Sequence, residues 1–293
     1  MSNAKKNILL VGGSGYLGNH LRNVISNYNL FFTSTTGREN SIQLDFSDTK
    51  TFDNIKTQSN YDCIFILASS LLGLGTTELK NEYIQLDTLG LSNFLQFVNE
   101  NKLTEKIIYT SSMTVYGTDN VLPVKEDGVL NPLSTYGLSK VLGETILKFH
   151  CQSTTTKGVV LRIPGIYGGN RTSGFIYNTA QKCKKNESIA IDSSSLGYWE
   201  TIHINDLSVS INEFIQNYDW KNNFNIFNIS YGTKTDFIDC ASIIKETLNS
   251  TSEIIHKGNK GYVDFYLDNS KVKQYVTIND NYISSLKSYL KSI

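Results

Sequence analysis

The feature that most limits the possible folds is a glycine-rich stretch that follows the first apolar segment. Residues 7–11 (NILLV) form a short, wholly apolar run, typical of a strand buried on both faces of a parallel sheet. Residues 12–18 (GGSGYLG) come directly after it, and a helical pattern runs from Tyr16 to about Ser26. A strand, a glycine turn and a helix in this order predict a dinucleotide-binding unit.

Each glycine of this turn has its own physical reason. Gly12 permits the tight turn, Gly15 lets a pyrophosphate approach the backbone, and Gly18 allows the helix to pack closely on the strand. Free N–H groups at the start of the helix would then face the phosphates. A merely structural turn is the alternative interpretation.

Strand and helix patterns alternate along the rest of the chain. We expect strands at 30–34, 41–44, 63–67, 106–110 and 158–163, and helices at 78–100, 135 to about 152 and 278–293. This order predicts an α/β fold with a doubly wound parallel sheet of the Rossmann type. Residues 1–168 would form the dinucleotide-binding domain, to which a strand near 224–230 returns. Residues 169–293 would mainly form a smaller C-terminal α/β substrate-binding lobe.

The amino-acid composition limits which classes of binding partner and which cellular compartment we expect. The 293 residues include 27 Lys and Arg against 27 Asp and Glu, so net charge gives no reason to expect nucleic acid or a membrane surface. No apolar run reaches the roughly 18 residues that span a bilayer, and the first residues lead into a strand rather than a signal peptide. The four cysteines are scattered without a CxxC pair, which favours a cytoplasmic protein without zinc or disulfides.

The end of the second expected strand bears on the choice of cofactor. An NAD site usually has an acid there to bond the ribose 2′-hydroxyl, but this chain offers Thr36 and Arg38, with no carboxylate before Glu39. Hydroxyls and a guanidinium suit a 2′-phosphate better, so the sequence favours NADP, with NAD as the alternative. Arg38 could also be a solvated loop residue.

A tyrosine and a lysine four residues apart begin the helix expected from residue 135. Tyr136 and Lys140 (YGLSK) would share one helix face, where the ammonium favours the phenolate and lowers the tyrosine pKa. Such a tyrosine could transfer protons near neutral pH. An ordinary Tyr–Lys pair on an amphipathic helix is the alternative.

Several longer segments carry a family resemblance. With the glycine turn, TSSMTVYG (110–117) and NPLSTYGLSK (131–140), the chain resembles the extended short-chain dehydrogenase/reductases. These are NAD(P)-dependent nucleotide-sugar epimerases, dehydratases and 4-ketoreductases. The segments LRIPGIYGGN (161–170), ETIHINDL (200–207) and DNSKV (268–272) are also similar to family signatures.

The resemblance implies roles for individual residues. Ser112 would hydrogen-bond the reacting sugar oxygen, with Ser111 as the alternative, Tyr136 would be the acid/base, and Lys140 would hold the nicotinamide ribose. The implied cofactor-binding set is Gly12, Gly15, Tyr16, Leu17, Thr36, Arg38, Asp45, Phe46, Leu67, Ala68, Ser69, Tyr136, Lys140 and Pro164. No metal is expected.

Departures from the family pattern narrow the reaction. Met113 and Thr114 stand where 4,6-dehydratases have an Asp-Glu pair, and Thr114 replaces the cysteine of the 3,5-epimerase/reductases. Redox chemistry at one carbon remains. The missing second-strand acid favours an NADP(H)-dependent reductase of a 4-keto nucleotide-activated deoxy sugar, serving polysaccharide synthesis. A 4-epimerase with tightly bound NAD is the alternative, and a non-catalytic dinucleotide sensor is a third hypothesis.

The substrate side of the resemblance is less regular. Trp199 and Glu200 replace an Arg-Asp pair, so Trp199 could stack on a base or sugar, and Arg171, Lys257 or Lys260 could bind the diphosphate. The expected substrate-binding set is Ser112, Thr114, Tyr136, Arg171 and Trp199.

Two further expectations come from the resemblance. The helices at 78–100 and after Thr135 would form a homodimer, with Tyr83, Leu86, Leu89 and Phe94 facing a partner or the core. Asp87 replaces a family asparagine, and the sequence gives no reason for it. His203 is expected to be structural.

Overall fold

The computed structural model describes residues 5–57, 60–70, 72–192, 194–258, 261–279 and 281–293. The chain forms two compact units, each built from several segments. The first contains residues 1–117, 130–162 and 215–227, and the second contains residues 118–129, 163–214 and 228–293. The sequence predicts a boundary at residue 168 between a dinucleotide-binding domain and a substrate-binding lobe, and this domain boundary stays a prediction.

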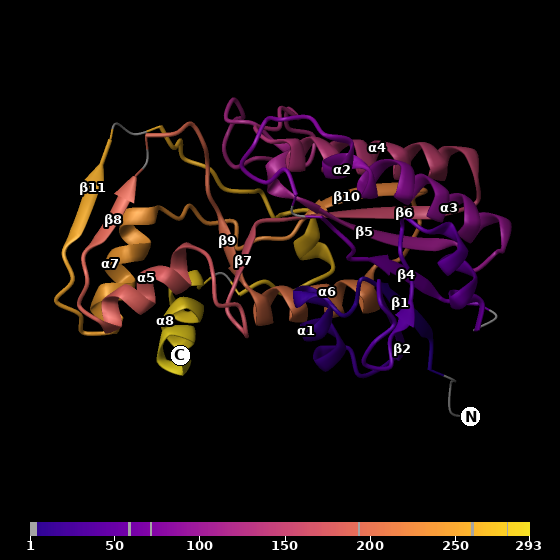
Figure 1. Ribbon diagram of the computed structural model, residues 1–293, viewed down its shortest axis with the longest axis horizontal. Coiled ribbons are helices and arrows are strands. Elements are labelled where there is room, and N and C mark those ends of the chain that lie inside the picture. Colours follow the sequence, from indigo (N-terminus) through magenta and orange to yellow (C-terminus); the bar gives the residue numbers. More distant parts are fainter. Residues whose placement is uncertain (1–4, 58–59, 71, 193, 259–260, 280) are drawn as a thin grey trace. The chain divides into compact units, whose positions relative to one another are not determined.

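A seven-stranded sheet organises the first unit (Figure 1). Its spatial order is β10-β6-β5-β4-β1-β2-β3, and β1 pairs in parallel with both β2 and β4. The strands are β1 (Asn7–Val11), β2 (Asn29–Ser34), β3 (Ile42–Gln43), β4 (Cys63–Ile66), β5 (Lys106–Ser112), β6 (Lys157–Ile163) and β10 (Phe224–Asn228). The order reverses direction at β1 and β4, which confirms the predicted doubly wound fold. The returning strand expected near 224–230 is β10.

Helices cover both faces of this sheet. Figure 1 shows α2, α3 and α4 on one side and α1 on the other. These elements are α1 (Tyr16–Val24), the 3₁₀ helix η1 (Thr49–Thr57), α2 (Asn81–Ile84), the π-helical turn η2 (Leu86–Gly90), α3 (Leu91–Glu100), the 3₁₀ turn η3 (Met113–Val115) and α4 (Thr135–Ser153). The single helix expected at 78–100 is therefore wrong in two respects: it begins at Asn81, and a π turn interrupts it.

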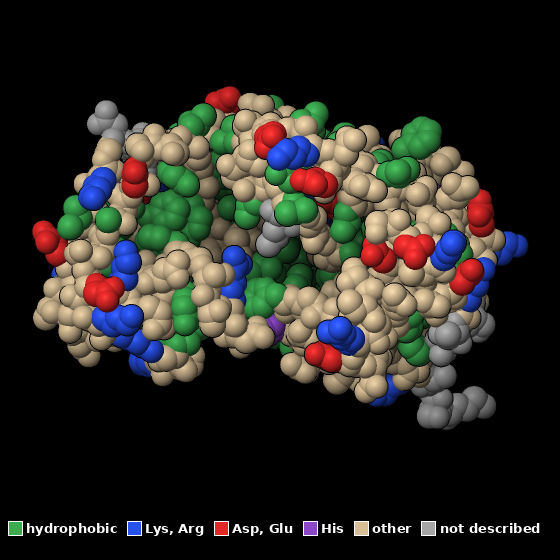
Figure 2. Space-filling model, viewed as in Figure 1, with side chains coloured by type: hydrophobic (Ala, Val, Ile, Leu, Met, Phe, Trp, Pro, Cys, Tyr) green, Lys and Arg blue, Asp and Glu red, His purple; other side chains and the backbone are tan. Residues whose placement is uncertain are grey.

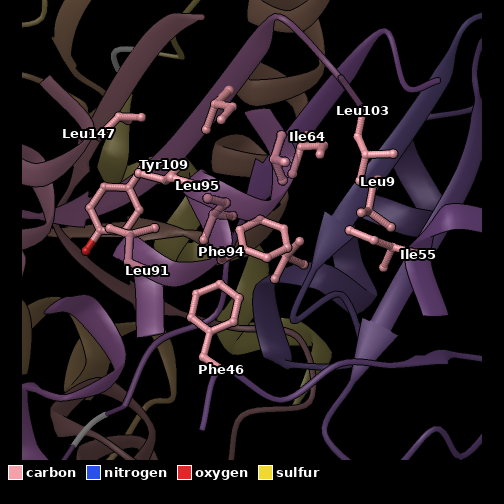
Figure 3. Close-up of a cluster of buried hydrophobic side chains, with 14 of the residues drawn as sticks. Leu9, Phe46, Ile55, Ile64, Leu91, Phe94, Leu95, Leu103, Tyr109 and Leu147 are labelled. Atoms are coloured by element: carbon pink, nitrogen blue, oxygen red, sulfur yellow. The ribbon is translucent and has the colours of Figure 1, made fainter. Parts of the chain in front are cut away.

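The core between the sheet and these helices is aliphatic and aromatic (Figure 3). Phe94 is fully buried; its ring stacks on Phe46 with centroids 4.9 Å apart and meets Phe52 edge-on at 5.5 Å. Burying one such side chain contributes about 1.5–3 kcal/mol to folding. The core thus fixes α3 against the strands that carry the carboxyl edge of the sheet.

The second unit combines helices with two small parallel sheets. β8 (Ile189–Asp192) pairs with β11 (Ile254–Lys257), and β7 (Gly165–Tyr167) pairs with β9 (Thr201–His203). Its helices are α5 (Phe175–Lys184), most of α6 (Ile204–Asn217), α7 (Phe237–Thr247), the 3₁₀ turn η4 (Val272–Gln274) and α8 (Tyr282–Ser292). Most of this unit comes from the C-terminal part of the chain, and α8 begins at Tyr282 rather than at residue 278, where the closing helix was expected.

The charged side chains are mixed in sign. Figure 2 shows Lys and Arg interspersed with Asp and Glu over the face in view, as equal numbers of the two charges suggest. Among the described residues, no helix is both long and apolar enough to cross a membrane.

Candidate active site

The glycine turn lies where β1 ends, next to the end of β4. Gly12 has φ +78°, its N–H donates to Thr33 Oγ1 over 3.0 Å, and a Cβ built on it would lie 2.8 Å from the Ala68 nitrogen. The predicted tight turn is therefore present, and two independent constraints exclude a side chain there. The turn sits at the switch point of the sheet, where doubly wound folds bind ligands.

The start of α1 is open to an anion. A Cβ on Gly18 would come within 2.5 Å of the Gly13 backbone, so α1 packs closely on the glycine turn; the predicted close packing of Gly18 on the strand stays a prediction. Gly15 is the N-cap residue of α1, all of whose residues are described. No side chain makes a capping hydrogen bond at this end of the helix, and its first turn contains no acidic residue. The N–H groups around Tyr16 and Leu17 thus carry the positive end of the helix dipole.

The loop after β2 presents its polar side chains outward. Thr36 and Arg38 are exposed. The loop is closed from within, since the Gly37 N–H donates to Ser34 Oγ over 2.9 Å and the Ser41 N–H donates to the Arg38 carbonyl over 3.0 Å. The two residues predicted to select the cofactor are therefore on an ordered turn.

The predicted cofactor residues after β3 and β4 have different surroundings. Asp45 is half-buried and its Oδ1 accepts bonds from the Ser47 N–H (2.8 Å) and hydroxyl (2.7 Å). Phe46 lies in the core on Phe94. Following β4, Leu67 and Ala68 donate their N–H groups to the Val11 carbonyl, and Ser69 is exposed. Leu67 and Ala68 therefore lie along the end of β1, and Ala68 contacts the glycine turn at Gly12.

Ser112 ends β5 and turns the chain into η3. Its Oγ accepts bonds from the Thr114 N–H at 3.2 Å and the Thr114 hydroxyl at 3.0 Å. Gly137 of α4 lies against the Thr114 carbonyl so closely that a Cβ would overlap it. The start of α4 is thus fixed beside the turn that carries Ser112.

Tyr136 and Lys140 follow in the first turns of α4. Ser134 caps this helix, its Oγ accepting the Gly137 N–H over 3.2 Å. Tyr136 is half-buried, Lys140 is buried, and the Lys140 Nζ lies 5.8 Å from the centroid of the Tyr136 ring. The phenol and ammonium therefore share one face of α4, as the i, i+4 spacing predicts.

Ser111, the alternative to Ser112, is bound elsewhere. Its hydroxyl donates to Glu144 Oε1 over 2.5 Å, and the other oxygen of that carboxylate pairs with Arg162 Nη2 at 2.7 Å. All three side chains are buried. Their arrangement anchors α4 to β5 and β6, and it favours Ser112 as the serine that faces a substrate.

Asp87 is the residue that the sequence singled out without explanation. It lies in the π turn η2, is only 2% exposed, and its Oδ1 is 2.9 Å from the Lys140 Nζ. The sequence signal that could have identified Asp87 as a functional residue was a charged residue at an inward position of an otherwise amphipathic segment. Its partner could not be identified, because Lys140 lies 53 residues away along the chain.

The predicted substrate residues of the second unit lie on different elements. Trp199 is half-buried and stacks on Phe237 with centroids 4.5 Å apart. Arg171 donates from Nη1 to the Ile166 carbonyl over 2.8 Å. Pro164 is buried between β6 and β7, and Lys257 is exposed at the end of β11. Lys260 lies outside the described residues.

Glu200, which precedes β9, and His203, its last residue, have structural contacts. Glu200 is fully buried, and burial raises the pKa of its carboxyl to about 8, opposed by hydrogen bonds such as that from the Leu267 N–H. His203 Nδ1 accepts the Asn205 N–H over 3.3 Å. Among the described residues, no cluster of three His, Cys, Asp or Glu could hold a metal ion, and all four cysteines are buried free thiols.

Comparisons with known proteins match most of the chain. Residues 8–230 match the NAD dependent epimerase/dehydratase family. The chain is 27% identical over 283 residues to "Putative UDP-glucose 4-epimerase" of Methanocaldococcus jannaschii, covering 91% of both. It is 33% identical over 169 residues to dTDP-4-dehydro-6-deoxyglucose reductase of Escherichia coli, covering 54% of this chain and 52% of that one.

Solved structures show the same fold. The crystal structure of UDP-glucose 4-epimerase from Thermotoga maritima superposes with a TM-score of 0.82, at 20% identity and with 97% of each chain covered.

Proposed function

Because the chain belongs to the NAD-dependent epimerase/dehydratase family, we propose that it is an enzyme that inverts C4 of a nucleotide-diphosphate sugar. The observation that supports this most is the placement of Tyr136 and Lys140 on one face of α4, whose first turn packs against the turn that follows Ser112 at the end of β5. One relative named as a 4-epimerase aligns over 91% of both chains, whereas other relatives named as 4-epimerases, and the relative named as a reductase, align over about half.

The residues present fit a bound dinucleotide. A Cβ would fill the space at Gly12, and the uncapped start of α1 suits the pyrophosphate. Lys140 would hold the nicotinamide ribose. When bound, the nicotinamide supplies the acceptor and donor of the hydride at the sugar carbon.

The chain's own residues supply the proton transfer and the orientation. The Tyr136 oxygen takes the proton of the sugar 4-hydroxyl and later returns it, and Ser112 donates a hydrogen bond to the same sugar oxygen. A positioned acid/base of this kind contributes about 10²–10⁴-fold to a rate. Inversion also requires that the ketone present its opposite face before it is reduced, so the site must hold the nucleotide more firmly than the sugar ring.

Dehydration does not fit this site. The turn after Ser112 consists of Met113, which is buried, and Thr114, whose hydroxyl bonds to Ser112. Neither side chain can remove a carbon-bound proton as a carboxylate does.

A 4-ketoreductase is the second candidate, and the loop after β2 favours it. Arg38 and Thr36 are exposed there and suit a 2′-phosphate, and reductases often use NADPH. The preference for a reductase that the sequence suggests is not confirmed, and we keep it as the alternative.

One assay separates the two candidates. The purified protein is incubated with a panel of UDP- and dTDP-hexoses, and C4 epimers are separated by chromatography while reduced cofactor is followed by absorbance. An epimerase forms the epimer without net change in the cofactor. Stoichiometric consumption of NADPH with a 4-keto sugar, and no epimer from any hexose, would establish the reductase instead.

A further inference from the structure

A buried pair of opposite charges, Asp87 and Lys140, lies near Tyr136, because the Lys140 Nζ is 5.8 Å from the centroid of the Tyr136 ring. Asp87 and Lys140 are 2% and 1% exposed, and Oδ1 and Nζ are 2.9 Å apart. Oδ1 also accepts the Tyr109 hydroxyl at 2.7 Å, and Oδ2 accepts the Ser139 hydroxyl at 3.0 Å. In Figure 3 the Tyr109 oxygen points out of the apolar cluster. The carboxylate therefore has three partners in a site closed to water.

The backbone is built to bring these groups together. The π turn η2 is closed by the Gly90 N–H donating to the Gln85 carbonyl over 3.0 Å, and it carries Asp87 inward. Gly143 leaves room on α4, since a Cβ there would overlap the Tyr109 hydroxyl and lie 3.2 Å from the Asp87 carbonyl. π turns frequently occur at functional sites.

Among the neighbouring charged groups, Asp87 is the one that determines the net charge near Tyr136. Glu144 of α4 is paired with Arg162 of β6, so these two contribute no net charge. Tyr109 of β5 is neutral, because burial first, and then the charge of Asp87, raise its pKa well above the usual range. The net charge of these described side chains of η2, β5, β6 and α4 is therefore zero with Asp87 and one positive charge without it.

We propose that Asp87 is a positioning residue that holds Lys140 and cancels its charge, and thereby sets the pH range in which Tyr136 exchanges its proton. The inference rests on the proposed role of Tyr136 as acid/base. An uncharged residue at position 87 would leave the ammonium uncompensated, and Tyr136 would ionise at lower pH.

The test uses the tyrosinate absorbance of the cofactor-free protein, titrated with alkali, so it needs no substrate. The protein has 17 tyrosines, and the Tyr136 signal is isolated as the difference between each protein and its Tyr136→Phe counterpart. We expect Asp87→Asn to lower the midpoint of the Tyr136 signal by about one to two pH units. Ser139→Ala is the matched control: it removes a hydrogen bond to the same carboxylate but keeps the charge, and should shift the midpoint much less.

A second variant covers the case in which Asp87→Asn fails to fold because Lys140 is left unpaired. In Asp87→Asn/Lys140→Met both charges are absent, and the wild-type midpoint should lie within about one pH unit of that of the double variant. A wild-type midpoint well below it, or an Asp87→Asn midpoint that is unchanged or raised, would overturn the inference. Absence of epimerase and reductase activity alongside the expected shifts would instead count against the proposed function alone.

Discussion

At the scale of single residues, Glu200 shows how burial changes a common side chain. Its carboxyl is fully buried and has its pKa raised to about 8 by burial, against an ordinary value of 4.5. Between these values the folded protein holds a proton that the unfolded chain has released. Stability therefore falls as pH rises through this range, by about 1.4 kcal/mol per pH unit.

This gives a prediction for Glu200→Gln. The amide keeps an acceptor for the Leu267 N–H and does not ionise, so its stability relative to the wild type should increase steadily from about pH 5 to about pH 8 and then level off. Urea unfolding at a series of pH values measures the difference. Glu246→Gln, an exposed carboxylate of α7, controls for the loss of one negative charge, and parallel curves for Glu200→Gln and wild type would contradict the prediction.

Tyr136→Phe tests the proposed chemistry at its central atom. The substitution removes only the phenol oxygen, so turnover should fall by about 10²–10⁴-fold while cofactor affinity changes little. Initial rates and a fluorescence titration with NAD measure the two effects. A comparable loss in cofactor affinity would mean that Tyr136 serves binding rather than proton transfer, and unchanged turnover would favour the non-catalytic sensor.

Arg38→Ala tests the cofactor preference. If the guanidinium pairs with a 2′-phosphate, the variant should bind NADPH about 10–100-fold more weakly, with NADH almost unaffected. Lys50→Ala, another exposed cation of the same unit, is the control. Equal changes for both cofactors would show that Arg38 is a solvated loop residue and would favour NAD.

At the scale of elements, the glycines of the turn between β1 and α1 have two different effects: one allows close packing of the helix, and the other leaves room for the pyrophosphate. A Cβ on Gly18 would press on the Gly13 backbone at 2.5 Å, whereas a Cβ on Gly15 would meet only the Gly12 carbonyl at 3.2 Å. Gly18→Ala should therefore lower the melting temperature. Gly15→Ala should leave it nearly unchanged yet weaken dinucleotide binding, because the methyl group occupies the approach of the pyrophosphate. Calorimetry and cofactor titration measure the two, and equal destabilisation would contradict this division of roles.

Strands of the seven-stranded sheet such as β1, β4 and β6 were predictable because each is a short, mostly apolar run with a distinct end, whereas the short strands of the second unit were not predicted. The helix at 78–100 was not predictable, because its first residues are held extended by contacts with α4. The Thr135 N–H donates to the Thr76 carbonyl over 2.8 Å, and the Thr135 hydroxyl donates to the Glu78 carbonyl over 2.8 Å. Such contacts join residues almost sixty apart and leave no local pattern.

In the candidate site, too, features set by local sequence were predictable and features set by contacts between distant segments were not. Ser112, Tyr136 and Lys140 were found because they lie in contiguous motifs at the ends of elements. The partnership of Asp87 with Lys140, and the burial of Phe46 on Phe94, depend on how separate segments pack. Residue type and spacing therefore predicted that Tyr136 and Lys140 share one face of α4, but not what surrounds them.

At the scale of the whole molecule, the expected homodimer can be placed on one layer of helices. Leu89 of η2 and Phe149 of α4 are 59% and 69% exposed. Figure 1 shows α4 on the same side of the sheet as α2 and α3. Phe94, which the sequence also offered to a partner, is fully buried and belongs to the core. Leu89 and Phe149 both belong to the two helical segments through which the family resemblance implies a dimer.

We therefore expect the protein to sediment as a dimer, and Leu89→Glu and Phe149→Glu to dissociate it. Burial of one phenylalanine contributes about 1.5–3 kcal/mol, and a two-fold interface counts each substitution twice, so Phe149→Glu should raise the dimer dissociation constant by at least about 10²-fold. Val121→Glu, at an apolar position of the second unit that is 89% exposed, should leave the dimer intact. Analytical ultracentrifugation over a dilution series measures all three. A monomeric wild type would show that no dimer forms. A dimer that only Val121→Glu dissociates would place the contact on the second unit, because a contact that includes α4 must be weakened by a charge at Phe149.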